Sequence, residues 1–193
     1  MSSTLSPIIY SFNINSDRRI QRFKRMFPFV ASGERYELIK RMFEIQLVEH
    51  PNTVFVLMEV REELALILDL LKDLGLHPFS HPYNESGSGS FQYVFASDPS
   101  YSKLEFIDQE YFTETGNPLS TEERELTPAW TGKFEKSTVR YKVNDTFYLM
   151  ALHPGLQDPH KMEVAKRVQA SVSKMKDLPT LVVGDFNAFR CEV

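Results

Sequence analysis

Four short apolar runs in this chain each end in an acid, an amide or a histidine, and this arrangement constrains the fold more than any other feature. The polar residues at the run ends are Asn13, Glu59, His153 and the pair Asp185 and Asn187. A carboxylate directly after an apolar run is costly to bury without a partner. In layered α/β architectures the loops at strand ends build the site, while the strands hold it rigid. The pattern therefore predicts an α/β fold with a functional site at its strand ends.

The spacing of apolar residues predicts alternating strands and helices in the N-terminal part of the chain. Strands are expected at 8–14 and 53–58, and helices at 34–49 and 61–74. The run 53–58 is apolar throughout, which is typical of a strand buried on both faces. Gly75 stands where a C-cap glycine belongs.

The remainder of the chain is predicted to be mostly β. Strands are expected at 77–83, 91–97, 103–107, 109–114, 137–143, 146–153 and 180–183. The pair Asn144-Asp145 suits a two-residue hairpin turn. Asp158-Pro159 is a typical helix start, so a helix is expected over 159–176, before another buried strand at 180–183. The stretches 15–33 and 115–135 are interpreted as loops.

Composition narrows the class of protein. The chain has 193 residues, of which 42% are hydrophobic and 25% charged, as in one soluble globular domain over 1–193. A net charge of -4 excludes a basic nucleic-acid coat, but a nuclease is compatible with it because a bound metal supplies positive charge. The single cysteine excludes a disulfide scaffold. The sequence has neither a membrane-spanning run nor a secretory signal, so an intracellular, cytoplasmic location is expected.

The two acids at strand ends suggest metal chemistry. Glu59 and Asp185 offer the hard oxygen ligands that Mg²⁺ prefers alongside a substrate phosphate. On an extended segment, Asp185 and Asn187 point the same way, since they are two residues apart. An acid can orient a water molecule, and a neighbouring amide can donate to a phosphoryl oxygen. This pair suits in-line attack on phosphorus.

Four sequence elements resemble the endonuclease/exonuclease/phosphatase superfamily, to which deoxyribonuclease I belongs. They are Ser11-Phe12-Asn13-Ile14, Leu57-Met58-Glu59-Val60, Leu152-His153-Pro154-Gly155-Leu156 and Val183-Gly184-Asp185-Phe186-Asn187. The resemblance implies a four-layer α/β/β/α sandwich and a metal-dependent phosphoesterase.

The resemblance also implies the roles of individual residues. Glu59 is expected to be the principal ligand of Mg²⁺, with Mn²⁺ as an alternative ion, and Asn13 to lie beside the metal. Asp185 is expected to orient the attacking water. Asn187 and His153 are expected to hold the scissile phosphate.

Further matches and departures bear on the substrate and on activity. Arg61 stands two residues after the glutamate, as in deoxyribonuclease-like members, where the resemblance implies contact with DNA, but this single match says little about the substrate. A nuclease-type phosphodiesterase is the favoured expectation from the resemblance as a whole. Met58 replaces the usual glutamine before the metal-binding glutamate. The family's Ser-Asp-His motif does not occur in the six residues after Asn187. The domain and its second sheet are therefore expected to be incomplete at the C-terminus, which puts activity in doubt.

Other interpretations remain open. The chain is alternatively an inactive family member or fragment that binds a partner, or a phosphomonoesterase or lipid phosphodiesterase on the same scaffold. Glu59 is alternatively an acid favoured at a helix start, and His153 a histidine bonded to backbone. His77 and His81 are interpreted as structural rather than as a metal pair. The basic residues of the first loop suit either a solvated loop or contact with nucleic-acid phosphates. They are Arg18, Arg19, Arg22, Lys24 and Arg25.

Overall fold

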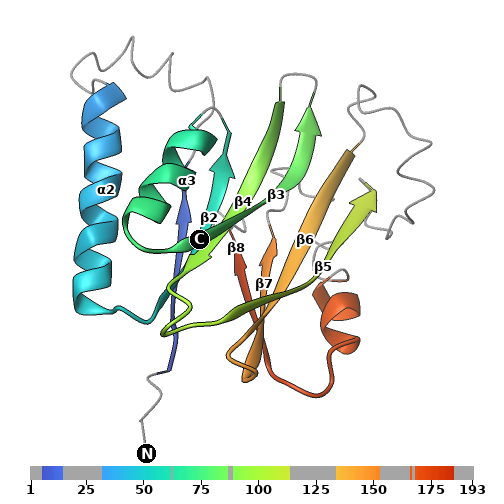
Figure 1. The fold of residues 1–193 in the computed structure, drawn as a ribbon. Helices are drawn as coiled ribbons and strands as arrows, with labels where there is room; N and C mark the ends of the chain where they lie inside the picture. The colour runs from blue at the N-terminus through green and yellow to red at the C-terminus, as the bar shows by residue number, and fades with distance from the viewer. Residues whose placement is uncertain are drawn as a thin grey trace, which may run out of the picture. The chain divides into compact units, whose positions relative to one another are not determined.

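The protein is described by a computed structural model that covers residues 6–14, 32–61, 63–86, 89–113, 134–152, 166 and 168–184. The chain divides into two compact units. The first consists of Met1–Phe79 and Val94–Lys103, and the second of Ser80–Tyr93 and Leu104–Val193. Two four-stranded sheets are present in the described part of the chain (Figure 1).

The first sheet has the strand order β1-β2-β4-β3. Its strands and the two helices between them are β1 (Ile8–Asn13), α2 (Ser32–Glu49), β2 (Thr53–Val60), α3 (Leu64–Asp73), β3 (His77–Ser86) and β4 (Gly89–Ser97). Strands β1 and β2 are parallel, with Ile8 paired to Thr53 and Asn13 to Met58. The predicted strands at 8–14 and 53–58 and the helix at 34–49 are confirmed, with ends shifted by at most two residues.

Helix α3 begins later than the predicted residue 61, because β2 continues to Val60 and the chain turns after it. The N–H of Leu64 donates to the carbonyl of Arg61 at 3.2 Å. At the other end Gly75 has a φ of +79°. Its N–H donates to the Lys72 carbonyl at 2.9 Å, so the predicted C-cap glycine is confirmed.

The apolar faces of α2 and α3 bury the core of the first unit. Ile39 and Phe43 from α2 join Ile67 and Leu71 from α3 in one buried cluster with Phe55 of β2. The ring centroids of Phe43 and Phe55 are 4.8 Å apart. Every residue of β2 from Thr53 to Met58 is buried, so the strand is buried on both faces as predicted. None of the described helices is both long enough and apolar enough to cross a membrane.

The second sheet has the strand order β5-β6-β7-β8. Its strands are β5 (Leu104–Thr113), β6 (Phe134–Val143), β7 (Phe147–Leu152) and β8 (Thr180–Gly184). The pairs β5–β6 and β6–β7 are antiparallel, and β8 runs parallel to β7. A parallel pair needs a crossover, and residues 168–173 within it are helical. The predicted helix over 159–176 is confirmed over 168–173, but its predicted end is wrong, since 174–176 are not helical. Residues 159–165 lie outside the described residues, as do 15–31 and 114–133.

Strand β5 corrects the prediction of two separate strands at 103–107 and 109–114. The chain continues as one strand, with a register shift between Phe106 and Asp108 against β6. A bulge of this kind adds one residue to a strand and bends it without ending it. Asp108, the residue between the two predicted strands, lies within β5 and pairs with Arg140.

The β6–β7 hairpin turns at the predicted residues, although its connection is longer than predicted. Asn144 and Asp145 have φ values of +48° and +56°, as a primed turn requires. The N–H of Thr146 donates to the Val143 carbonyl at 2.9 Å. Val143 pairs with Phe147, so three residues rather than two connect the strands.

Strand β8 is not the fully buried strand that its apolar sequence predicted. Leu181 is 43% exposed, and Val182 and Val183 are half-buried. Among the described strands β8 has one hydrogen-bonded neighbour, β7, whereas β2 lies between two. Position in the sheet decides burial here, and the apolar run alone does not reveal it.

Candidate functional site

The first pair of strand ends belongs to β1 and β2. Asn13 is the register partner of Met58, the residue before Glu59. The N–H of Ile14 donates to the Met58 carbonyl at 2.9 Å, so pairing continues to the end of β1. Because the two strands are parallel, the backbones of Asn13 and Glu59 lie at neighbouring positions at the carboxyl ends of β1 and β2.

Glu59 has a left-handed backbone, with a φ of +53°. This conformation costs a non-glycine residue about 1 kcal/mol or more, and such strain is found most often at functional sites. Glu59 is half-buried, whereas every other residue of β2 is buried. The chain thus tolerates strain at the one acidic residue of this strand.

The second pair of strand ends belongs to β7 and β8. Leu152 is the register partner of Gly184, and the strands are parallel. His153 follows the first strand and Asp185 follows the second, so the structure describes both strands up to the residue before each predicted site residue. His153, Asp185 and Asn187 themselves lie outside the described residues.

Gly184 is required by the close approach of β8 to β7. A Cβ atom at this position would overlap the carbonyl oxygen of Leu152, which is backbone and has little freedom to move. The glycine of the Gly-Asp-Phe-Asn element therefore has a packing reason of its own. It lets the last residue of β8, directly before Asp185, lie close to the backbone of β7.

Replacing Gly184 by alanine is expected to lower the free energy of unfolding by about 1–3 kcal/mol, because the added methyl group forces β8 away from β7. Urea unfolding measures the change. At Gly75 no atom lies within 4 Å of an added Cβ, so Gly75→Ala should cost only the backbone strain at positive φ, about 1 kcal/mol. Wild-type stability of Gly184→Ala would contradict the close packing.

Comparison with family models finds no match to this sequence, and comparison with curated proteins finds none either. Solved structures do match. ANGEL2, a 2′,3′-cyclic phosphatase, aligns with a TM-score of 0.63 and 17% identity, over 95% of this chain and 53% of that one. An endonuclease/exonuclease/phosphatase family protein from Bacteroides thetaiotaomicron aligns with a TM-score of 0.62 and 20% identity, over 95% and 64% of the two chains.

The chain has the endonuclease/exonuclease/phosphatase fold. The likeness confirms the predicted resemblance and fold class, a deoxyribonuclease I-like α/β fold. Mannosyl-6-phosphatase Bt3783 from Bacteroides thetaiotaomicron has it too, with a TM-score of 0.60 and 19% identity over 94% of this chain and 66% of that one. The chain spans 53–66% of the length of these three structures.

Arg61 follows β2 in this endonuclease/exonuclease/phosphatase fold and is half-buried. Its carbonyl accepts the N–H of Leu64 and so takes part in the start of α3. Met58, the residue before Glu59, is 2% exposed. Arg61 thus lies two residues beyond Glu59, and its contact with DNA stays a prediction.

The donor chemistry at the first pair of strand ends fits Mg²⁺. Glu59 supplies a carboxylate and Asn13 an amide oxygen, both hard ligands, from neighbouring backbone positions. No group of three or more His, Cys, Asp or Glu side chains that could hold a metal ion occurs among the described residues. The remaining predicted site residues fall outside those ranges.

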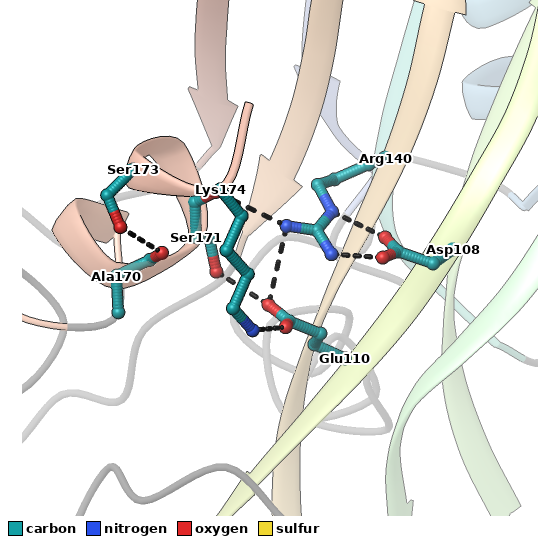
Figure 2. A network of polar contacts seen from close by, with 7 residues as sticks. All are labelled: Asp108, Glu110, Arg140, Ala170, Ser171, Ser173 and Lys174. Atoms are coloured by element: carbon teal, nitrogen blue, oxygen red, sulfur yellow. Dashed lines mark hydrogen bonds and ion pairs between the residues drawn. The ribbon is translucent and has the colours of Figure 1, made fainter. Parts of the chain in front are cut away.

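An ion cluster around a buried arginine in the second unit was not predicted (Figure 2). We call it the Arg140 cluster, and its members are Arg140 on β6, Asp108 and Glu110 on β5, and Ser171 and Lys174 beyond β7. The Arg140 side chain is only 4% exposed. Its guanidinium donates to both carboxylate oxygens of Asp108 and lies 3.5 Å from Glu110.

Glu110 connects the sheet to the crossover helix. Its carboxylate accepts the Ser171 hydroxyl at 2.7 Å and pairs with the Lys174 ammonium. Burial alone would raise the pKa of Glu110, but hydrogen bonds from Lys174 and Ser171 and the charge of Arg140 lower it below the ordinary value. The alternating acids Asp108 and Glu110 could have indicated such a cluster, but the predicted strand break at Asp108 obscured it.

The contribution of Glu110 to stability should depend on pH. Because the pKa of Glu110 is lower in the folded state, its charged carboxylate stabilises the fold fully above about pH 4.5, the ordinary pKa of a glutamate. This stabilisation is lost as the pH falls through the lower pKa of the folded state. Near pH 7, Glu110→Gln is therefore expected to lower the free energy of unfolding by about 1.5–3 kcal/mol. Urea unfolding between pH 3 and 7 measures it. A difference that grows as pH falls would contradict this sign.

His81 lies in an aromatic contact in the second unit. Its Nε2 is 2.7 Å from the Tyr141 hydroxyl, and its ring stacks on Phe106 with centroids 5.0 Å apart. Burial lowers the pKa of His81 and so favours the neutral ring. These contacts support the structural interpretation of His81 that the sequence predicted.

Proposed function

We propose that the protein is a Mg²⁺-dependent phosphoesterase, and that it hydrolyses phosphodiesters such as those of nucleic acids. The observation that carries the proposal is the pair of parallel strand ends at Asn13 and Glu59, where an acid occupies strained backbone. The fold supports it, since the similar structures include a 2′,3′-cyclic phosphatase and a mannosyl-6-phosphatase.

In the proposed reaction, Glu59 and Asn13 would hold the cation, and its charge would offset the negative charge of the phosphoryl group. Asp185 orients a water molecule for attack on phosphorus opposite the leaving oxygen. Asn187 and His153 donate to the phosphoryl oxygens. The bond from phosphorus to the ester oxygen breaks, and the products are a phosphate monoester and an alcohol.

A second candidate function is hydrolysis of phosphate monoesters, because one of the similar structures is a mannosyl-6-phosphatase. The Glu59 and Asn13 pair is compatible with both substrate classes, because a cation held there would act on non-bridging phosphoryl oxygens, which both classes have.

One assay tests both. The full chain is incubated with a 5′-labelled single-stranded oligonucleotide, with bis(p-nitrophenyl) phosphate and with p-nitrophenyl phosphate, each with Mg²⁺, with Mn²⁺ or with EDTA. Cleavage of the first two that EDTA abolishes supports the phosphodiesterase. Cleavage of p-nitrophenyl phosphate alone supports the phosphomonoesterase. Absence of metal-dependent cleavage of all three counts against an active enzyme.

A further inference from the structure

The Arg140 cluster fastens the segment that leads into β8. Ser171 belongs to the helical residues 168–173, and Lys174 follows them. Ser171 is 1% exposed, and its hydroxyl donates to Glu110 at 2.7 Å. The guanidinium of Arg140 also donates to the Ser171 carbonyl at 3.4 Å. Figure 2 shows these contacts converging from β5, β6 and the helix. The end of the crossover helix is thus held to the sheet by contacts with Glu110 and with the buried guanidinium of Arg140.

The segment between the crossover helix and β8 is also attached to Tyr148 on β7. The N–H of Tyr148 donates to the Pro179 carbonyl at 2.8 Å, and its hydroxyl donates to the Asp177 carboxylate at 3.2 Å. Tyr148 is also the register partner of Thr180, the first residue of β8. The segment from Ser171 to Thr180 is therefore attached at both of its ends.

Strand β8 depends on these attachments because it is short and has one hydrogen-bonded neighbour among the described strands. A slip of one residue would turn every side chain of β8 to the opposite face. It would also bring a residue with a side chain opposite Leu152, where only Gly184 fits. Register therefore decides the position at which the chain leaves β8 toward Asp185.

We propose that the Arg140 cluster is a positioning device that sets the register of β8, and through it the position from which Asp185 acts. Glu110 and Ser171 are positioning residues in this arrangement, since they act through the crossover helix. The inference rests on the proposed function for the role of Asp185, whereas the register of β8 can be measured independently of it.

The test compares two serines of the same helix. Ser171→Ala removes the hydroxyl that donates to Glu110. Ser173→Ala is the matched control, because the Ser173 hydroxyl donates to the Ala170 carbonyl at 2.8 Å, within the helix (Figure 2). Hydrogen exchange of the full chain is followed for the amides of 180–184. We expect exchange about tenfold faster in Ser171→Ala, as for the loss of a hydrogen bond to a charged group, and wild-type exchange in Ser173→Ala.

A kinetic measurement separates positioning from simple stabilisation. With bis(p-nitrophenyl) phosphate and Mg²⁺, Ser171→Ala is expected to lower kcat about tenfold and leave KM unchanged, because orientation is lost rather than binding. A merely structural role would lower the melting temperature without changing kcat per folded molecule. Ser173→Ala should keep the wild-type kcat.

Two results would overturn the inference. One is exchange of 180–184 in Ser171→Ala that equals that of the wild type or of Ser173→Ala. The other is faster exchange with an unchanged kcat, which would separate the register of β8 from catalysis. Absence of hydrolysis by the wild-type chain would overturn the proposed function, and with it the role of Asp185, while exchange would still decide whether the cluster holds β8 in its observed pairing with β7.

Discussion

Replacing Glu59 by glutamine is expected to lower Mg²⁺-dependent phosphoester hydrolysis by about 100-fold or more. The substitution keeps the shape of the side chain but removes the negative charge that the proposed metal site needs. Because the backbone of residue 59 stays left-handed in both proteins, the free energy of unfolding should change by less than about 1 kcal/mol. Steady-state kinetics over a range of Mg²⁺ concentrations and urea unfolding measure the two effects.

Two further variants make the Glu59 prediction specific. Glu49→Gln is the matched control, since Glu49 is an exposed acid at the end of α2, and this variant should keep wild-type activity. Glu59→Gly should lose activity without losing stability, because glycine adopts a positive φ without steric cost. Full Mg²⁺-dependent hydrolysis by Glu59→Gln would remove Glu59 from the proposed site.

Replacing Arg140 by methionine is expected to lower the free energy of unfolding by about 3–5 kcal/mol. Methionine fills most of the volume of the arginine stem, but Asp108 and Glu110 lose their shared cation. Asp108 loses both hydrogen bonds from the guanidinium, whereas Glu110, of which 17% is exposed, loses one cation and keeps its pair with Lys174. The size of the effect comes from breaking ion pairs made by an arginine that is only 4% exposed. Urea unfolding at pH 7 measures it.

Lys142 provides the control on the same strand. It lies two residues from Arg140 on β6 and pairs with Glu105 and Asp145 near the hairpin turn. Both acids are well exposed, so Lys142→Met should leave the unfolding free energy almost unchanged. Equal losses of unfolding free energy in Arg140→Met and Lys142→Met would show that burial of the Arg140 side chain does not determine its contribution to stability.

Most elements of the fold could be predicted from local patterns. The helix over 34–49 follows from apolar spacing, and Gly75 from the need for positive φ after α3. The errors arose where the local pattern is ambiguous. The bulge near Asp108 resembles a strand end, because the extra residue of a bulge interrupts alternation in the same way. The apolar run at 180–183 resembles β2, because an edge strand and a central strand can share a composition.

The candidate site was predicted residue by residue from strand-end polarity and from the resemblance. The structure adds two features that neither could supply, which are the left-handed backbone of Glu59 and the steric need for Gly184. The Arg140 cluster was missed because its members come from β5, β6 and the crossover segment, far apart along the chain.

The amino-acid sequence by itself determined the alternation of strands and helices and the polar residues that follow the strands, because these depend on neighbours a few positions away. Which strand lies at a sheet edge, which glycine faces a carbonyl, and which acid meets Arg140 were decided only by tertiary structure. Each of these depends on the register between segments distant in the chain, and register arises from side-chain packing and hydrogen bonds that form when the sheets assemble.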